Sequence, residues 1–150
     1  MSRDCRNFSK RKEELLKVSQ RLSAIRNSYV TKTTSDIVNR EPRFICIEDL
    51  NTKGMMKNKH LSKAVQQQKF YEFRRQITYK AERHSIPLII ADKWFPSSKT
   101  CSCCGFVNKD LKLSDRTFIC PKCGNKIDRD YQASLNLKRY GEHQICETAF

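Results

Sequence analysis

Four cysteines near the C-terminal end have the spacing of metal ligands. They form two Cys-x-x-Cys pairs, each followed by glycine: Cys101 with Cys104, and Cys120 with Cys123. A tetrahedral zinc ion needs four soft ligands that converge on one point, and two facing turns of this kind supply them. Because so short a segment buries little apolar core, the metal would largely hold it together. Cys103 is a spare thiol inside the first pair and competes with Cys104 for the role of ligand.

Three acidic residues stand where metal-assisted chemistry on a phosphodiester is feasible. Glu48 ends a short apolar run, and Asp128 and Asp130 follow the second cysteine pair, where a helical pattern begins. Carboxylates from separate elements can together hold two Mg²⁺ ions about 4 Å apart, which neutralise a scissile phosphate and activate a water molecule. Acidic residues also commonly cap helices, so Asp128 or Asp130 fits an N-cap equally well. The residues alone leave both interpretations open.

Two apolar runs predict the strands that would position Glu48. Residues 44–47 and 87–91 are short and rich in β-branched side chains, which is typical of buried strands. Between them, residues 65–84 have helical periodicity, and the Lys-rich segment 51–63 is expected to be an exposed loop. One face of the helical segment is apolar and comprises Phe70, Phe73, Ile77 and Ala81. A strand, a helix and a strand with a crossover of this length predict a βαβ unit and an α/β fold.

The N-terminal region predicts a long helix. Its first twelve residues are polar and basic, and an apolar stripe then recurs at alternating spacings of three and four residues. The stripe consists of Leu15, Val18, Leu22, Ile25 and Tyr29. Ser9 is the expected N-cap, and the pattern continues toward Val38 before Pro42 breaks it. We interpret the stripe as the core-facing side of an amphipathic helix rather than as a binding surface.

The region of the cysteine pairs predicts a zinc ribbon followed by a helix. Residues 111–113 and 117–119 have the composition of two short strands between the pairs. Residues 128–140 then follow a helical pattern. Its residues available for packing are Ala133, Leu135, Leu137 and Tyr140. From Gly141 onward we predict no regular structure.

The charge balance indicates a polyanionic partner. The chain carries 30 Lys and Arg against 16 Asp and Glu, a formal net charge of +14, which favours nucleic acid over a membrane surface. A solvated basic face explains any single cation as well. The cations expected to contact phosphate are Lys53, Lys57, Lys59, Arg74, Arg75 and Arg129. No apolar run approaches the roughly 20 residues that span a bilayer, and the remaining cysteines show no disulfide spacing, so we expect a cytoplasmic protein.

At these residues the chain resembles the C-terminal part of the TnpB (OrfB) family of insertion-sequence proteins, which are related to the type V CRISPR nucleases. The resemblance rests on blocks that follow the family's order and spacing: residues 45–51, 53–55, 97–105, 120–124 and 128–137. Each block alone is a weak signal. As a set the blocks are highly specific, and they cover nearly the whole chain.

The resemblance implies a partial RNase H-like, RuvC-type nuclease domain with an inserted four-cysteine zinc ribbon. It also implies three acidic residues that hold two Mg²⁺ ions in an enzyme that cuts DNA under the guidance of an RNA. Glu48 falls on the family's second acidic motif. Asp130 falls on the third, where Gln132 replaces the usual Asn and Ala133 follows. The four paired cysteines fall on the zinc ligands.

The family's first acidic motif and its RNA-holding N-terminal region find no match, because Asp4 lacks the apolar strand that the motif requires. We expect a partial nuclease core over residues 1–100, a zinc ribbon over 101–124, and the core's last helix with a tail over 125–150. The first functional interpretation is a transposon-associated TnpB-like DNA endonuclease or accessory transposase fragment that is inactive alone. The alternatives are a basic zinc-ribbon protein that binds DNA or RNA without cutting it, and a decayed reading frame. Self-association, or completion by another chain, stays open because the predicted strands lack neighbours.

Overall fold

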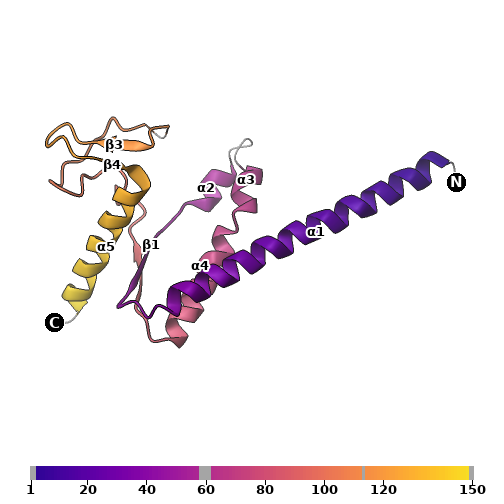
Figure 1. The fold of residues 1–150 in the computed structure, drawn as a ribbon, viewed down its shortest axis with the longest axis horizontal. Coiled ribbons are helices and arrows are strands. Elements are labelled where there is room, and N and C mark those ends of the chain that lie inside the picture. The colour runs from indigo at the N-terminus through magenta and orange to yellow at the C-terminus, as the bar shows by residue number, and fades with distance from the viewer. Residues whose placement is uncertain (1–2, 58–61, 113, 149–150) are drawn as a thin grey trace. The chain divides into compact units, whose positions relative to one another are not determined.

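The computed structural model describes residues 3–57, 62–112 and 114–148 (Figure 1). The chain divides into two compact units. The helical unit comprises residues 1–42 and 52–85, and the sheet–ribbon unit comprises residues 43–51 and 86–150. The acidic candidates and the paired cysteines all belong to the sheet–ribbon unit. Among the helices of the described residues, none combines the length and apolar character that crossing a bilayer requires.

The described residues of the helical unit form the helices α1 (Arg3–Val38), α2 (Thr52–Met56), α3 (Ser62–Gln67) and α4 (Phe70–Arg83). The C-terminal part of α1 packs against α4, and the buried apolar residues there are Val30, Val38, Ile77 and Ala81. The predicted apolar face of residues 65–84 is therefore confirmed most clearly in its second half. Ile77 and Ala81 are fully buried, whereas Phe70 and Phe73 are half-buried.

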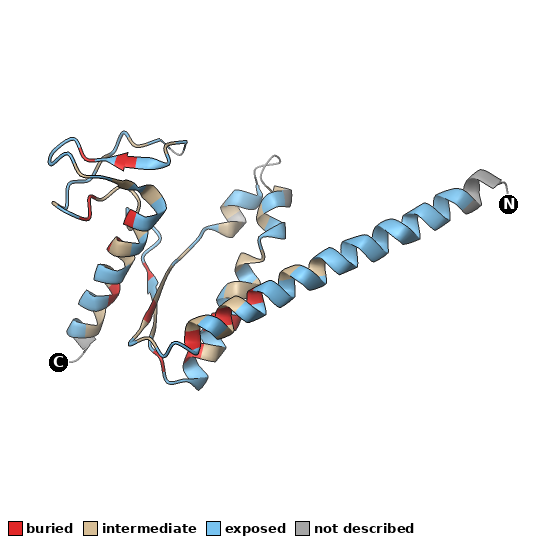
Figure 2. Cartoon of the chain, in the orientation of Figure 1, coloured by how far each residue is buried: buried red, intermediate tan, exposed pale blue. Residues whose placement is uncertain are grey.

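The first helix departs from the sequence-based expectation in its start and in its apolar face. It begins at Arg3, so Ser9 lies inside the helix and is not its N-cap. The stripe is not a core face, because its members are exposed along the N-terminal two-thirds of the helix, which is pale blue in Figure 2. Tyr29 is 71% exposed while the adjacent Val30 is only 7% exposed. The α4 helix therefore covers a different side of α1 from the one that the periodicity marked.

The segment that precedes the second strand contains more and shorter helices than predicted. The short helix α2 occupies part of the stretch 51–63 that was expected to be a loop, and residues 58–61 lie outside the described residues. Residues 65–84 do not form one helix, because Lys69 has a φ of 56° between α3 and α4. This left-handed conformation is uncommon for a residue with a β-carbon and ends a helix locally. Hydrophobic periodicity does not encode such a break.

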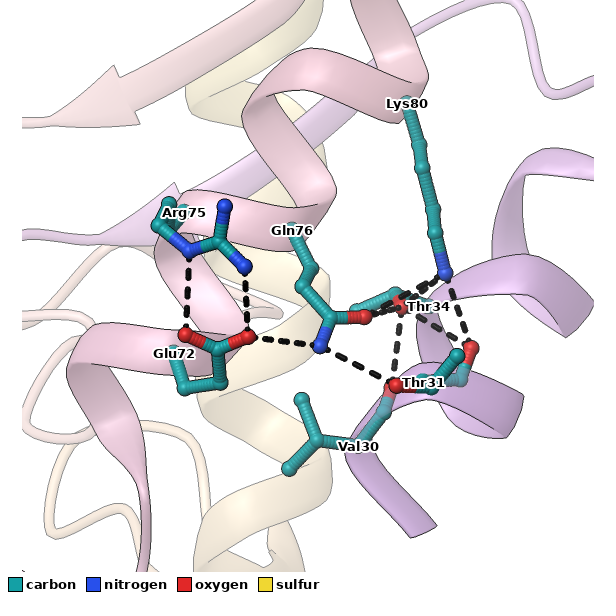
Figure 3. A network of polar contacts seen from close by, with 7 residues as sticks. All are labelled: Val30, Thr31, Thr34, Glu72, Arg75, Gln76 and Lys80. Atoms are coloured by element: carbon teal, nitrogen blue, oxygen red, sulfur yellow. Dashed lines mark hydrogen bonds and ion pairs between the residues drawn. The ribbon is translucent and has the colours of Figure 1, made fainter. Parts of the chain in front are cut away.

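A polar network joins α1 to α4 beside their apolar contacts (Figure 3). The Lys80 ammonium donates to Thr34 Oγ1 at 2.7 Å and to the Thr31 carbonyl at 2.9 Å. The Thr34 hydroxyl also lies 3.2 Å from Gln76 Oε1, and Gln76 Nε2 donates to Thr31 Oγ1 at 3.1 Å. Burial lowers the pKa of Lys80. Because these polar groups satisfy one another, the network fixes the register of α1 on α4.

The sheet–ribbon unit begins with two parallel strands, β1 (Ile45–Glu48) and β2 (Leu88–Ala91), with Glu48 opposite Ala91. Both predicted strands and their parallel pairing are confirmed. Helix α5 (Arg129–Thr148) packs against this pair and continues through the tail that was predicted to be irregular. A Cβ atom at Gly141 would overlap the aromatic ring of Phe44. Glycine at this position therefore permits a close approach of helix and strand instead of ending the helix.

The ribbon contains a different strand pair from the predicted one. Strand β3 (Thr117–Ile119) is confirmed, but it pairs antiparallel with β4 (Lys126–Asp128), which follows the second cysteine pair. Residues 111–112 are not a strand, and Leu113 lies outside the described residues. The turn at Cys120–Cys123 reverses the chain as a hairpin does, so β3 meets the segment just after the turn. Phe118, Cys101 and Cys120 form the buried core of the ribbon.

Candidate metal centre and acidic site

The four predicted cysteine ligands converge on one point. Their sulfur atoms all lie within 4.8 Å of one another. Cys101 Sγ is 3.7 Å from Cys123 Sγ, and Cys104 Sγ is 3.6 Å from Cys120 Sγ. A tetrahedral zinc ion with Zn–S bonds of about 2.3 Å separates its sulfur ligands by about 3.8 Å. The cluster therefore fits a four-coordinate metal, and Cys103, which is exposed and outside the cluster, is not part of it.

Both cysteine pairs use the same backbone turn. The glycine that follows each pair donates its N–H to the carbonyl of the first cysteine at 2.9 Å, from Gly105 to Cys101 and from Gly124 to Cys120. The two glycines have φ values of 73° and 72°, a conformation that glycine adopts without strain. These turns point further backbone N–H groups at the sulfur atoms, which is the usual support of a structural zinc site.

Hydrogen bonds and mutual repulsion set the ionisation of the thiols. Burial opposes ionisation of Cys101, but the N–H groups of Cys104 and Cys103 and the neighbouring thiols outweigh it and lower its pKa to about 6. The N–H group of Asn125 favours ionisation of Cys123, yet burial and the other three sulfurs raise its pKa to about 12. The thiolate form is thus favoured at Cys101 and opposed at Cys123, and a bound cation would offset the repulsion at Cys123.

The first acidic candidate is held by a neighbouring loop. Glu48 is exposed at the end of β1, and Ser97 donates a short hydrogen bond from its hydroxyl to the Glu48 carboxylate. The amide nitrogen of Asn136 in α5 donates to the carbonyls of Ser97 and Thr100, each at 2.7 Å. Sequence reasoning assigned no role to Ser97 or Asn136, although both lie in blocks of the family resemblance. Their types alone carry no signal, because the contacts join segments about forty residues apart.

The structure separates the roles of the two aspartates at the start of α5. Asp128 Oδ1 accepts hydrogen bonds from the backbone N–H groups of Asp130 and Tyr131, both at 2.9 Å. Asp128 is therefore the helix cap. The Asp130 side chain is 72% exposed, and Arg129 lies 3.4 Å from its carboxylate. Asp128 is thus the residue that caps α5, and the Asp130 carboxylate is exposed to solvent.

Glu48 and Asp130 lie toward the same end of the sheet–ribbon unit. Gly141 of α5 meets Phe44 just before β1, while Asn136, nearer the start of α5, is linked through one serine to Glu48 at the end of β1. Helix α5 therefore runs antiparallel to β1, with Asp130 on the Glu48 side. Eleven residues separate Asp130 from Gly141, which places them about 20° apart around the helix. Asp130 thus projects from the face of α5 that meets β1.

The predicted phosphate-binding cations are distributed over both units. Lys57 is exposed after α2, and Lys53 lies within α2, whereas Lys59 falls outside the described residues. Arg74 is exposed on α4, and the neighbouring Arg75 pairs with the Glu72 carboxylate at 2.8 Å. In the sheet–ribbon unit, the Arg129 side chain is only 16% exposed. Of this set, Lys57, Arg74 and Arg75 are exposed, whereas the Arg129 side chain is largely covered.

Residues 70–137 match the model of the Cas12f1-like TNB domain. A protein of Streptomyces pristinaespiralis that is named as an RNA-guided DNA endonuclease is 33% identical over 135 residues, which cover 90% of this chain and 33% of that protein. Escherichia coli K12 contains a protein named as RNA-guided DNA endonuclease InsQ, 26% identical over 150 residues that cover 90% of this chain and 37% of that protein.

A viral relative and a solved structure extend these matches. The TnpB-like protein L79 of Acanthamoeba polyphaga mimivirus is 29% identical over 143 residues, which cover 89% of this chain and 27% of that protein. One chain of a cryo-EM structure of a Cas12f1–sgRNA–target DNA complex has a similar fold, with a TM-score of 0.59 and 21% sequence identity. That similarity covers 90% of this chain and 41% of that chain.

The resemblance drawn from the motifs is thereby confirmed: over most of its length the chain is similar to proteins named as TnpB-like or as RNA-guided DNA endonucleases. It spans about one third of the length of the curated relatives that it matches.

Proposed function

We propose that this chain forms part of the RuvC-type nuclease core of a transposon-associated, RNA-guided DNA endonuclease, with DNA and a guide RNA as its partners. The names of the relatives support this proposal, since several are RNA-guided DNA endonucleases. The single observation that carries it is the placement of Glu48 and Asp130 toward one end of the sheet–ribbon unit. Asp128 supplies the helix cap, so the Asp130 carboxylate is available to a metal.

Each side chain at the acidic site has a distinct role in this proposal. Glu48 and Asp130 are the magnesium ligands, and Mg²⁺ supplies charge neutralisation at the scissile phosphate and an activated water. Ser97 orients the Glu48 carboxylate through its hydroxyl, and Asn136 fixes the loop that carries Ser97. A structural Zn²⁺ in the four-cysteine cluster would hold the two turns of the ribbon together. Arg129 lies beside Asp130 and is suited to contact a DNA phosphate near the metal site.

Two carboxylates are fewer than the three that the family resemblance implies. Losing one charged ligand sharply weakens a two-metal site, so we propose that the chain alone binds a divalent ion weakly and does not cleave DNA. Cleavage then requires a third carboxylate from another segment or polypeptide.

The test combines divalent-ion binding with a cleavage assay on the zinc-loaded chain. Mn²⁺ binding is measured for the wild type, Glu48→Gln and Asp130→Asn, with Asp128→Asn as the matched control because asparagine also caps helices. We expect binding that is lost in the first two variants and retained in the control, with no cleavage of single- or double-stranded DNA. If the wild type cleaves DNA and Glu48→Gln does not, the proposal that the chain alone is inactive is wrong. Mn²⁺ binding that neither variant changes would overturn the acidic site.

The net charge of +14 supports a second function, a basic zinc-ribbon protein that binds DNA or RNA without cutting it. Under this alternative, affinity for nucleic acid falls steeply with salt and is unaffected by Glu48→Gln. Replacing Lys57 and Arg74 weakens binding equally for all sequences, because both cations would contact the phosphate backbone.

A further inference from the structure

The N-terminal two-thirds of α1 is mostly exposed (Figure 2), and an apolar stripe runs along it. Its members, with the exposed fraction of each, are Phe8 70%, Leu15 70%, Val18 57%, Leu22 45%, Ile25 55% and Tyr29 71%. Isolated helices are only marginally stable in water, and extended apolar patches on a protein surface usually mark an interaction site. We therefore expect a partner that covers the stripe.

The spacing of the stripe specifies a helical partner. From Leu15 to Tyr29 the members alternate at three and four residues, and Phe8 lies one further heptad upstream. This 3.5-residue repeat is the pattern of a coiled-coil seam, and residues 8–29 extend for about 33 Å, or three heptads. The α1 residues that are buried against α4 lie on a side of the helix about 140° from the stripe. The stripe is therefore not a continuation of the contact with α4.

We propose that two copies of the chain associate through this stripe as an antiparallel pair of α1 helices, with Leu15 of one copy opposite Val18 of the other. The same register places Phe8 opposite Ile25 and Arg11 opposite Leu22, and every pair occurs twice by symmetry. The long Arg11 side chain covers the leucine with its methylene groups and keeps its guanidinium in water.

Charges beside the stripe select this register. Glu14 and Arg21 flank the stripe on the same side, and the proposed antiparallel register places each Glu14 next to Arg21 of the other copy. A parallel pair instead places Arg21 next to Arg26 of the other copy. The antiparallel register shifted by one heptad toward the C-terminus places the two Arg21 side chains together. Like charges at these flanking positions destabilise a helix pair, and opposite charges stabilise it.

The length of the free segment agrees with the same register. In this arrangement residues 8–25 of one copy pair with residues 25–8 of the other, and this segment lies before Val30, the first buried residue among the described part of α1. The contacts of α1 with α4 therefore remain intact in both copies. The few polar contacts made by earlier residues, such as Lys69 with Ser23 at 3.3 Å, lie outside the stripe.

The test is sedimentation of the full zinc-loaded chain, treated with nuclease, at increasing concentration. We expect a dimer that Leu22→Glu dissociates and that Leu16→Glu retains. Leu16 is the matched control because it is a leucine of the same helix, 53% exposed, outside the stripe. Glu14→Arg and Arg21→Glu should each weaken the dimer about tenfold, since each places like charges together twice, and the double variant should restore it.

Three results would overturn the proposal. A chain that remains monomeric at about 100 μM would show that two copies do not pair through the stripe with a dissociation constant in the micromolar range. A dimer that survives Leu22→Glu uses another surface. Failure of the double charge variant to restore association would exclude the antiparallel register. Circular dichroism of each variant verifies that the helices themselves persist.

Discussion

The different roles of Asp128 and Asp130 at the start of α5 can be tested by measuring the stability of variants alone. Asp128 accepts two backbone hydrogen bonds at 2.9 Å, whereas the Asp130 carboxylate accepts none from the helix backbone among the described contacts. Loss of an N-cap typically costs about 1 kcal/mol. We therefore expect Asp128→Ala to lower the free energy of unfolding by about 1 kcal/mol, and Asp130→Ala to change it by less than about 0.5 kcal/mol.

The assay is urea unfolding of the zinc-loaded chain together with hydrogen exchange at single amides. In Asp128→Ala, the amides of Asp130 and Tyr131 should exchange about fivefold faster, the factor that corresponds to about 1 kcal/mol. Asp128→Asn is the control and should retain the cap, because asparagine accepts the same bonds. Equal losses for Asp128→Ala and Asp130→Ala would refute the assignment, since Asp130 would then stabilise the helix instead of being free for a metal.

Three further predictions follow from single contacts. Gly141→Ala should destabilise the chain by about 1 kcal/mol in thermal or urea unfolding, because displacing the Phe44 ring outweighs the gain in helix propensity; a stabilised variant would contradict the close approach. The hydrogen bond from Arg75 lowers the pKa of Glu72 to about 2 from its ordinary value of 4.5. The ion pair therefore stabilises α4 fully above about pH 4.5, and this stabilisation is lost as the pH falls through 2. A midpoint near pH 4 in an NMR titration of Glu72 would contradict this prediction. Cys104→Ser should lose bound zinc and Cys103→Ser should keep one equivalent by elemental analysis, whereas the opposite pattern would reassign the ligand.

Local signals predicted the features that depend on local chemistry. The cysteine pairs are confirmed as one cluster because each Cys-x-x-Cys-Gly turn is set by its own backbone. The two apolar runs are confirmed as strands because short runs rich in isoleucine favour extended backbone. Their parallel pairing follows the expectation from the length of the crossover between them. Within each cysteine turn the determining contacts lie within a few residues of one another.

Contacts between distant segments determined what the sequence could not predict. The hydrogen bond from Ser97 to Glu48 depends on how a loop returns to the end of β1, and neither residue type reveals it. Gly141 suggested a helix end, yet it is the point where α5 approaches Phe44. The left-handed Lys69 divides a segment whose periodicity is continuous. In each case the tertiary structure determines the conformation, and the local sequence preference does not.

The exposed stripe of α1 illustrates a limit of periodicity. The alternation of Leu15, Val18, Leu22 and Ile25 correctly indicates one apolar face, but it does not indicate what covers that face. The 3.5-residue repeat fits a coiled-coil seam better than the wider stripe of a core helix, and this distinction was present in the sequence.

The most direct test of the acidic site asks whether Glu48 and Asp130 hold the same ion. Mn²⁺ is added in small amounts to the isotopically labelled, zinc-loaded chain, and paramagnetic broadening of backbone signals is mapped. Signals around Glu48 at the end of β1 and around Asp130 at the start of α5 should broaden together. In Glu48→Gln, both sets of signals should remain sharp. Broadening at only one of the two residues, or broadening that Glu48→Gln leaves unchanged, would contradict a shared metal site.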